Sequence, residues 1–247
     1  MVVLPLVFLL SNILLIRLKQ YKRDLSRYLQ TSYIINWKNP SVLNELTKII
    51  KDIPENDDVQ KAIKLFYYVR DNIKYRVTTD VSTPNFLKAS TTLARRDGHC
   101  VCKAILLTAF ARSAGIPTKL HFVDLKNHQL TREWIDKFGE EILWHGYVEF
   151  FLDGKWVKAN PAYDKELCIK HNYQITEFNG KDDALFAQQD LLGNKFIEYV
   201  KDHGTYARVP YIPMFSTWFS YYAFHILKYR RKEQKLMQKN INKSKIS

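Results

Sequence analysis

Cys100 and Cys102 stand one residue apart where Gly98 and His99 give way to a long apolar run. A thiol at the start of a helix experiences the partial positive charge of the helix end, and a nearby imidazolium lowers its pKa further. Residues two apart on a helix do not share a face. We therefore predict that Cys100 is a nucleophile with a lowered pKa and that Cys102 is a core residue.

Other uses of the thiols are disfavoured by their number and spacing. The chain has three cysteines, and an odd, sparse set does not suggest a disulfide framework. One residue between Cys100 and Cys102 is too short for a typical zinc-ligand pair, and no second Cys/His pair follows at ligand spacing. No acidic loop of EF-hand type is present either. The sequence predicts neither a metal nor a cofactor.

A histidine suited to assist the thiol is placed by a hairpin. Asp153-Gly154 lies between two strand-like runs, which is a strong signal for a two-residue turn. In such a turn the numbers of paired residues sum to 307, so His145, Tyr147 and Asn160 project from one side of the sheet. A histidine oriented by an amide or carboxylate is what a thiol nucleophile needs.

Each residue alone has a simpler interpretation. A cysteine in an apolar helix is usually inert core, and a single histidine on a strand is usually structural. The combination of a cysteine at a helix start, a strand histidine and an asparagine on the same face favours catalysis.

The surrounding pattern predicts an α+β fold, with the cysteine on a central buried helix and the histidine on an antiparallel sheet. Residues 57–75 read as an amphipathic helix capped by Asp57, and residues 100–114 as a helix that is apolar on nearly all faces. Gly115 and Pro117 end the second helix, and residues 118–125 form a strand. At 247 residues, the chain suits one domain with extensions.

The basic charge is concentrated at the two ends of this sequence. Residues 17–27 and 228–247 together supply +11 of the net charge of +13, so the segment between them is nearly neutral. This distribution indicates an anionic membrane surface touched by the ends rather than a basic groove. No helix-turn-helix, zinc-finger or RNP motif is present, so we expect no nucleic-acid partner.

The two apolar ends leave alternatives open. Residues 1–16 carry no charge and precede a basic flank, which is compatible with a membrane anchor, a helix packed on the domain, or a secretory signal. An anchor of this polarity would keep the core in the cytoplasm. Residues 212–227 are aromatic and apolar. We favour a final helix that covers the core over an interfacial helix, and we expect the tail after Lys228 to be solvated and partly disordered.

Several motifs together resemble the transglutaminase-like superfamily, whose fold is similar to that of papain-type cysteine proteases. GHCVCKAILLTAFARSAGIPTKLHFVD resembles its nucleophile helix and following strand, HGYVEFFLDGKWVKANPAYD its histidine hairpin, and FYYVRDNIKY its preceding helix. The resemblance covers roughly residues 28–210 and is closest to a bacterial and archaeal branch. It predicts an end segment over 1–27, a catalytic domain over 28–211, and an aromatic helix with a basic tail over 212–247.

The resemblance implies that Cys100 is the nucleophile, His145 the general base, and Asn160 the third member of a triad. The family usually has Asp at the third position; Asn keeps an orienting hydrogen bond but not the charge that stabilises imidazolium. Asp164 is the reserve candidate. The implied activity is acyl transfer on an amide or peptide, as an amidase, protease or transglutaminase. The alternative is a weak or inactive domain that serves as a peptide-binding or membrane-surface scaffold.

Overall fold

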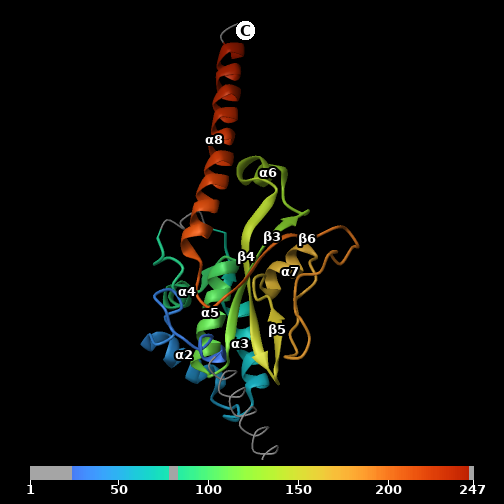
Figure 1. Cartoon of the computed structure of the whole chain (residues 1–247). Helices are drawn as coiled ribbons and strands as arrows, with labels where there is room; N and C mark the ends of the chain where they lie inside the picture. Colours follow the sequence, from blue (N-terminus) through green and yellow to red (C-terminus); the bar gives the residue numbers. More distant parts are fainter. Residues whose placement is uncertain (1–23, 78–82, 245–247) are drawn as a thin grey trace, which may run out of the picture.

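The computed structural model describes residues 24–77 and 83–244. An antiparallel sheet has the strand order β5-β4-β3-β6. Its strands are β3 (Thr118–Asn127), β4 (Glu141–Leu152), β5 (Lys155–Ala159) and β6 (Ile197–Tyr206). Helices gather beside this sheet (Figure 1), which confirms the predicted α+β class.

The helix α5 (Cys100–Ser113) occupies the centre of the molecule. Its residues are buried from Cys100 to Arg112, because the sheet covers one side and three helices cover the others. These helices are α2 (Pro40–Ile50), α3 (Asp58–Asn72) and α4 (Ala89–Arg95). The predicted central helix is thus confirmed. The predicted cap of α3 is also present, since the Asp57 side chain accepts a hydrogen bond from the Gln60 N–H.

Buried cations on α5 are satisfied by backbone carbonyl groups. Lys103 Nζ donates to the carbonyl oxygens of Arg70 and Ile73 at 2.9 and 2.6 Å. Arg112 donates to Thr118 O and Gln30 O. These contacts explain how the two main polar residues in the apolar run can be buried without a carboxylate at hydrogen-bonding distance.

The hairpin has the predicted register. Leu152 pairs with Lys155 and Val148 with Ala159. The turn residues Asp153 and Gly154 have φ angles of +47° and +83°, and a two-residue turn of type I′ requires positive φ at both positions. Asn160 follows directly after β5.

A short parallel pair of strands brings an aromatic residue to the start of α5. In this pair, β1 (Lys74–Tyr75) lies beside β2 (Asp97–Gly98), and Tyr75 is the partner of Gly98. Only His99 separates Gly98 from Cys100. The pairing therefore fixes Tyr75 near the N-terminus of α5.

The C-terminal helix α8 (Tyr211–Ser244) packs on α6 (Arg132–Phe138) and on the first residues of β4, and then extends away from the rest of the protein (Figure 1). Gly139 ends α6 with φ +88°, and a Cβ atom there would collide with the Tyr221 side chain. Farther along, Lys232 pairs with Asp136 of α6 at 2.7 Å. The short helix α7 (Lys165–His171) contacts α3.

The first turns of α8 cover the core through Met214 and Trp218, as favoured from the sequence. The expected disorder after Lys228 is wrong for the described residues, because the helix continues to Ser244. This part contains helix-forming Lys, Arg, Glu and Gln and no Gly or Pro. No helix in the described ranges is long and apolar enough to cross a membrane. The apolar run 1–16 lies outside those ranges.

Candidate active site

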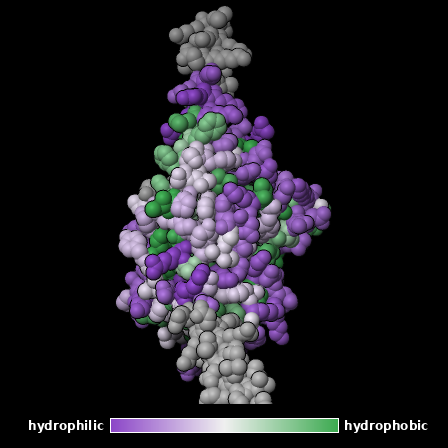
Figure 2. Space-filling model, in the orientation of Figure 1, coloured by the Kyte–Doolittle hydropathy of each residue, from purple (hydrophilic) through white to green (hydrophobic). Residues whose placement is uncertain are grey.

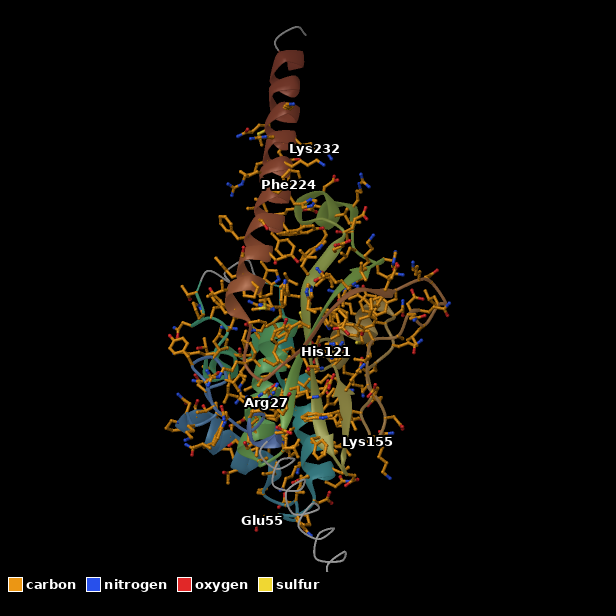
Figure 3. The ribbon with its side chains drawn as sticks, viewed as in Figure 1. Arg27, Glu55, His121, Lys155, Phe224 and Lys232 are labelled. Atoms are coloured by element: carbon orange, nitrogen blue, oxygen red, sulfur yellow. The ribbon has the colours of Figure 1, made fainter. Side chains whose placement is uncertain are left out.

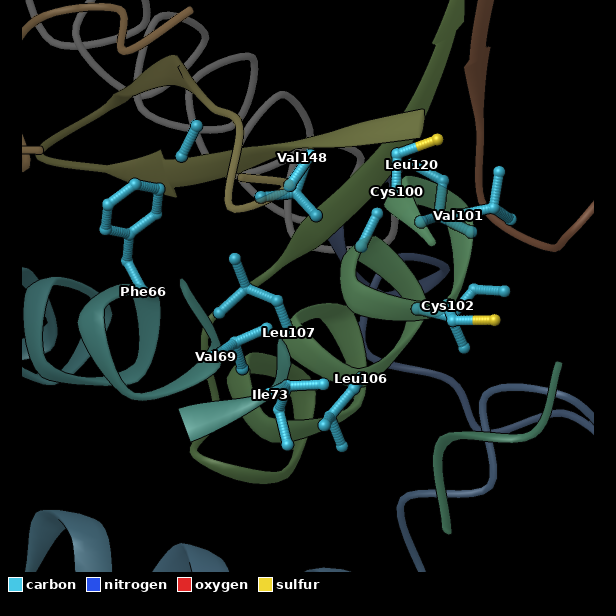
Figure 4. Packing of buried hydrophobic residues seen from close by; sticks show 14 of the residues in the cluster. Phe66, Val69, Ile73, Cys100, Val101, Cys102, Leu106, Leu107, Leu120 and Val148 are labelled. Atoms are coloured by element: carbon cyan, nitrogen blue, oxygen red, sulfur yellow. The ribbon is translucent and has the colours of Figure 1, made fainter. Parts of the chain in front are cut away.

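Cys100 is the first residue of α5 and is 5% exposed. It lines a pocket of about 340 Å³ between the start of α5, the start of β4 and α8. Cys102 is not among the residues that line this pocket, and Figure 4 shows the two sulfur atoms well apart at the first turn of α5. Cys100 thus lies at the pocket and Cys102 in the core, while the catalytic role of Cys100 stays a prediction.

The resting thiol of Cys100 is protonated at neutral pH. Burial raises its pKa to about 11, although the backbone N–H groups of Gly146, Val101 and Cys100 lower it by hydrogen bonding. The sequence-based expectation of a lowered pKa is thus contradicted, because burial outweighs the effect of the helix end. The same three N–H groups can also stabilise negative charge that develops near the sulfur.

His145 immediately precedes Gly146, the residue of β4 that approaches the first turn of α5. A Cβ atom on Gly146 would stand 3.3 Å from Val101 Cα, so the absence of a side chain lets β4 approach the first turn of α5. His145 is 2% exposed, and burial lowers its pKa to about 3. The imidazole is therefore neutral at pH 7, the form that can accept a proton.

Asn160 is fully buried beside this histidine. A hydrogen bond with the Asn160 side chain raises the pKa of His145, whereas burial lowers this pKa by a larger amount. The amide oxygen also accepts a hydrogen bond from Ala162 N at 3.1 Å, which fixes the side chain. In the described part of the chain, His145 Nε2 and Asn160 Nδ2 are buried without a hydrogen-bond partner. Unsatisfied buried polar atoms are costly, and in native proteins such atoms call for an explanation, of which a catalytic role is one.

The strand is irregular immediately before His145. Val123 pairs with His145 but Leu125 pairs with Ile142, so β4 has one extra residue here, a β-bulge. Trp144 lies in the bulge with φ +57°, a conformation that is costly for a residue with a large side chain. Asp124 Oδ1 accepts a hydrogen bond from Trp144 N at 2.8 Å. This contact holds the bulge that sets the direction of His145.

The aromatic ring of Trp144 is held as well. It stacks on His203 with a centroid distance of 4.0 Å and an interplanar angle of 8°. His203 Nε2 lies 2.7 Å from the same Asp124 oxygen that holds the Trp144 backbone. Strands β3, β4 and β6 are thereby joined around the residue that precedes the histidine.

The reserve residue Asp164 has a structural position. It caps α7, with one carboxylate oxygen accepting from Leu167 N at 3.1 Å, and the other accepts from Tyr75 N at 2.8 Å. Cys102 is fully buried, with its sulfur 3.5 Å from His99 Nε2 and 3.8 Å from Arg95 Nη2. Burial raises the Cys102 pKa to about 12.

Most of the pocket wall was not identified as functional from the sequence. Helix α8 supplies Phe215, Trp218, Phe219, Tyr222, Ala223 and Ile226, and α6 supplies Trp134 and Phe138. The aromatic run over 212–227 was visible, but the sequence did not show that it would lie against Cys100. A second pocket of about 470 Å³ lies between residues 54–59 and the hairpin turn, and neither cysteine nor histidine lines it.

Tyr75 is the other residue that the sequence did not single out. It lines the pocket together with Cys100. Burial raises its pKa well above the ordinary value, and the neighbouring Tyr163, Cys100 and Tyr222 act in the same direction. Tyr75 therefore remains a neutral phenol that can donate a hydrogen bond near the thiol.

Among the residues that the structure describes, no group of three or more His, Cys, Asp or Glu side chains is arranged to hold a metal ion. The chemistry considered below uses only the protein's own side chains and backbone.

Comparisons with known proteins agree with the class that this geometry indicates, an α+β domain with a cysteine at a helix start and a histidine on the adjacent strand. Residues 47–161 match the model of the transglutaminase-like superfamily. The protein thus has a transglutaminase-like domain, and the predicted resemblance to this superfamily is confirmed. No curated protein matches the chain.

Solved structures are similar at low identity. A candidate cysteine protease from Cytophaga hutchinsonii is 14% identical with a TM-score of 0.43, over 74% of this chain and 54% of that one. The periplasmic domain of TgpA from Pseudomonas aeruginosa is 18% identical with a TM-score of 0.36, over 57% and 47%. This chain spans about half the length of each.

Proposed function

We propose that the protein is a cysteine-dependent acyl-transfer enzyme that acts on an amide or peptide through Cys100, His145 and Asn160. The observation that carries the proposal is the position of Cys100. Its thiol lines an apolar pocket, receives hydrogen bonds from backbone N–H groups, and lies beside the strand segment that carries a neutral imidazole.

The reaction starts from a neutral pair, since the Cys100 pKa is about 11 and the His145 pKa about 3. His145 accepts the thiol proton as the sulfur attacks the substrate carbonyl carbon, so the charge separates only during the reaction. The carbon–nitrogen bond then breaks, and His145 returns the proton to the leaving amine. Water, activated by the same imidazole, cleaves the thioester and regenerates the thiol.

The remaining groups have supporting roles in this proposal. Asn160 favours the protonated form of His145 during the reaction, and Asp124 holds the bulge at Trp144 that aims the imidazole. Backbone N–H groups beside Cys100 and the Tyr75 hydroxyl donate to the oxyanion. Asp164 is less suited to the third position, because both of its oxygens already accept backbone hydrogen bonds.

The alternative is a transglutaminase-like scaffold without turnover. One feature favours it: the raised pKa of the Cys100 thiol. An inactive scaffold would still contain the pocket, but it would not form and release an acyl-enzyme.

The test is acylation by p-nitrophenyl acetate, followed by mass spectrometry of the peptides. We expect an acetyl group on Cys100 that is released with a measurable rate, and its loss in Cys100→Ala. Cys102→Ala and Cys168→Ala are matched controls, because both remove a buried free thiol. Acylation that persists in Cys100→Ala contradicts the nucleophile. If Cys100 of the unmodified protein is acetylated but the acetyl group is not released, the result supports the scaffold instead.

A further inference from the structure

The pocket in front of Cys100 has a composition that defines its ligand. Most of its walls are aromatic and aliphatic, and the part of the lining that α8 contributes consists wholly of Phe215, Trp218, Phe219, Tyr222, Ala223 and Ile226. Such a wall favours apolar groups because it cannot replace the hydration of a charge.

The titratable groups in the lining do not reverse this character. Glu141 is the one carboxylate among the described lining residues, and Lys126 Nζ lies 4.0 Å from it. His99 is buried, and burial lowers its pKa to about 4, so the ring is uncharged at neutral pH. The ring lies between Phe86 and Trp218. At neutral pH, the lining thus presents an uncharged surface apart from a carboxylate within reach of a lysine.

The helical wall is fixed relative to the reacting groups. Trp218 Nε1 donates to Leu143 O at 2.8 Å, and Leu143 N donates to the Tyr222 hydroxyl at 3.3 Å. Glu141 N similarly donates to the Tyr221 hydroxyl at 3.4 Å. Leu143 lies two residues before His145 on the same strand. The side chains of α8 are therefore positioned by the strand that carries the proposed base.

The size and opening of the pocket indicate one occupant. Its volume of about 340 Å³ lies at the low end of the range of roughly 300–1,000 Å³ for small-molecule sites, which suits a single large side chain with its peptide unit. Phe219 lines the pocket while 67% exposed, so the wall is open to solvent and has unpartnered apolar surface. Figure 3 shows Phe224 farther along the same helix, outside the lining.

We propose that α8 and α6 form a specificity pocket for a large apolar side chain, aromatic or branched, adjacent to the carbonyl that Cys100 attacks. This proposal rests on the proposed function for the role of Cys100, but the binding preference can be measured without catalysis. It assigns a substrate-binding role to the C-terminal helix, which lies outside the segment 47–161 that matches the family.

The experiment measures the rate of alkylation of Cys100 in the full chain at pH 9 by three reagents: iodoacetamide, N-benzyl iodoacetamide and N-hexyl iodoacetamide. Each rate is divided by the rate at which the same reagent alkylates glutathione. Peptide mass identifies the modified cysteine. We expect the normalised rate to be about tenfold higher for the benzyl and hexyl reagents, equivalent to ~1.4 kcal/mol of pocket binding. Equal normalised rates for the three reagents would overturn the proposal.

Variants test whether the pocket is the cause. Ala223→Phe fills the pocket and should reduce the ratio of the normalised benzyl rate to the iodoacetamide rate to about one. Phe219→Ser is a second variant, used in case Ala223→Phe does not fold, and it should reduce the same ratio severalfold. Phe224→Ala is the matched control on the same helix, 62% exposed, and should retain the preference. A preference that survives both Ala223→Phe and Phe219→Ser would locate the binding elsewhere and contradict the proposal.

Two further outcomes separate the hypotheses. Another tenfold increase with N-dodecyl iodoacetamide would indicate a long acyl chain, as in a lipid, and would overturn the assignment to a side chain. The reagents alkylate any ionised thiol. A retained benzyl preference therefore supports the pocket even if no ester is turned over, and in that case only the proposed catalytic function fails.

Discussion

The two walls of the Cys100 pocket differ in how they are built. The core wall includes His99 and Cys100 at the start of α5 and Leu143 on β4, and these side chains are almost completely buried. His145 and Asn160 are buried as well but do not line the pocket. The helical wall comprises α6 and α8, and Phe219 in it is largely exposed. The core wall contains Cys100, the proposed nucleophile, and the helical wall contains mainly groups that can bind apolar surface.

The difference has a physical cause. A nucleophile and a base must be held in one geometry. The proposed pair is positioned by a buried helix, a hairpin register and a bulge at Trp144. A binding surface only needs shape and low polarity, so it can be supplied by an amphipathic helix added to the domain. We therefore expect changes in the core wall to alter turnover, and changes in the helical wall to alter selectivity and docking of α8.

The largest expected effect is on the core wall. His145→Ala should lower the rate of ester turnover by roughly 10³-fold, because the thiol would lose its general base. The measurement is steady-state hydrolysis of p-nitrophenyl acetate. His128→Ala is the control, since His128 contacts Glu198 near the surface. A loss of less than tenfold in His145→Ala would remove this residue from the mechanism.

Tyr75→Phe should reduce kcat by about 10²-fold with little change in KM, because it removes one hydroxyl donor to the oxyanion. Both constants are obtained from the same ester assay. Tyr33→Phe, at a tyrosine that is 63% exposed, is the control for loss of a phenol hydroxyl. Equal reduction of kcat in both variants, or a change confined to KM, would argue against an oxyanion donor.

Acid should destabilise the core wall. The pKa values of His99 and His145 in the folded protein are about 4 and about 3, below the ordinary value of 6.5. Between about pH 4 and 6.5 the unfolded chain binds a proton at each histidine and the folded protein does not, so falling pH favours unfolding. Each histidine should contribute a slope of ~1.4 kcal/mol per pH unit.

Urea unfolding at pH 7, 6 and 5 measures this slope, and His145→Gln should reduce it. The stability should be fully present above about pH 6.5. A free energy of unfolding that stays constant from pH 7 to 5 would show that the two rings are not buried as neutral groups.

On the helical wall, Trp218→Phe should lower the free energy of unfolding by about 1–2 kcal/mol, because the carbonyl of Leu143 would lose its donor. Chemical denaturation measures the change. Ile212→Val is the control on the same helix, at a side chain that is 79% exposed, and should have an effect within about 0.5 kcal/mol. Equal effects of the two variants would mean that α8 is not anchored through Leu143.

The smallest effect concerns the basic part of α8, for which binding to an anionic membrane surface stays a prediction. Arg230→Gln should weaken binding to vesicles that contain phosphatidylserine about fivefold, as expected for ~1 kcal/mol per basic residue near the surface. Lys155→Gln is the control, because Lys155 lies on the hairpin far from α8 (Figure 3). Equal weakening by both variants would indicate non-specific attraction.

The secondary structure of the core wall could be predicted from the sequence because its determinants are local. Asp153-Gly154 specifies the turn, alternation along the strands specifies the faces, and the apolar run after His99 specifies a buried helix. The raised pKa of Cys100 was not predicted, because it depends on the depth of burial rather than on the helix end. The bulge at Trp144 was also missed, since its cause is a tertiary contact with Asp124.

The helical wall could not be predicted in the same way. The aromatic run over 212–227 indicates an amphipathic helix, but periodicity alone does not say which part of the domain the helix packs against. Figure 2 shows apolar side chains on the visible surface among hydrophilic ones, including at the level where α8 passes α6. The contact with β4 depends on Tyr221, Tyr222 and Trp218 reaching backbone groups more than seventy residues earlier.

The bonds from α8 to Leu143 make the helix and the pocket thermodynamically linked. A molecule that occupies the pocket contacts α8 only while the helix is docked, so it must stabilise docking by the same factor by which docking strengthens its own binding. Amide hydrogen exchange in the first turns of α8 would then slow in proportion to occupancy. The C-terminal helix would report, through its own opening rate, whether the space in front of Cys100 is filled.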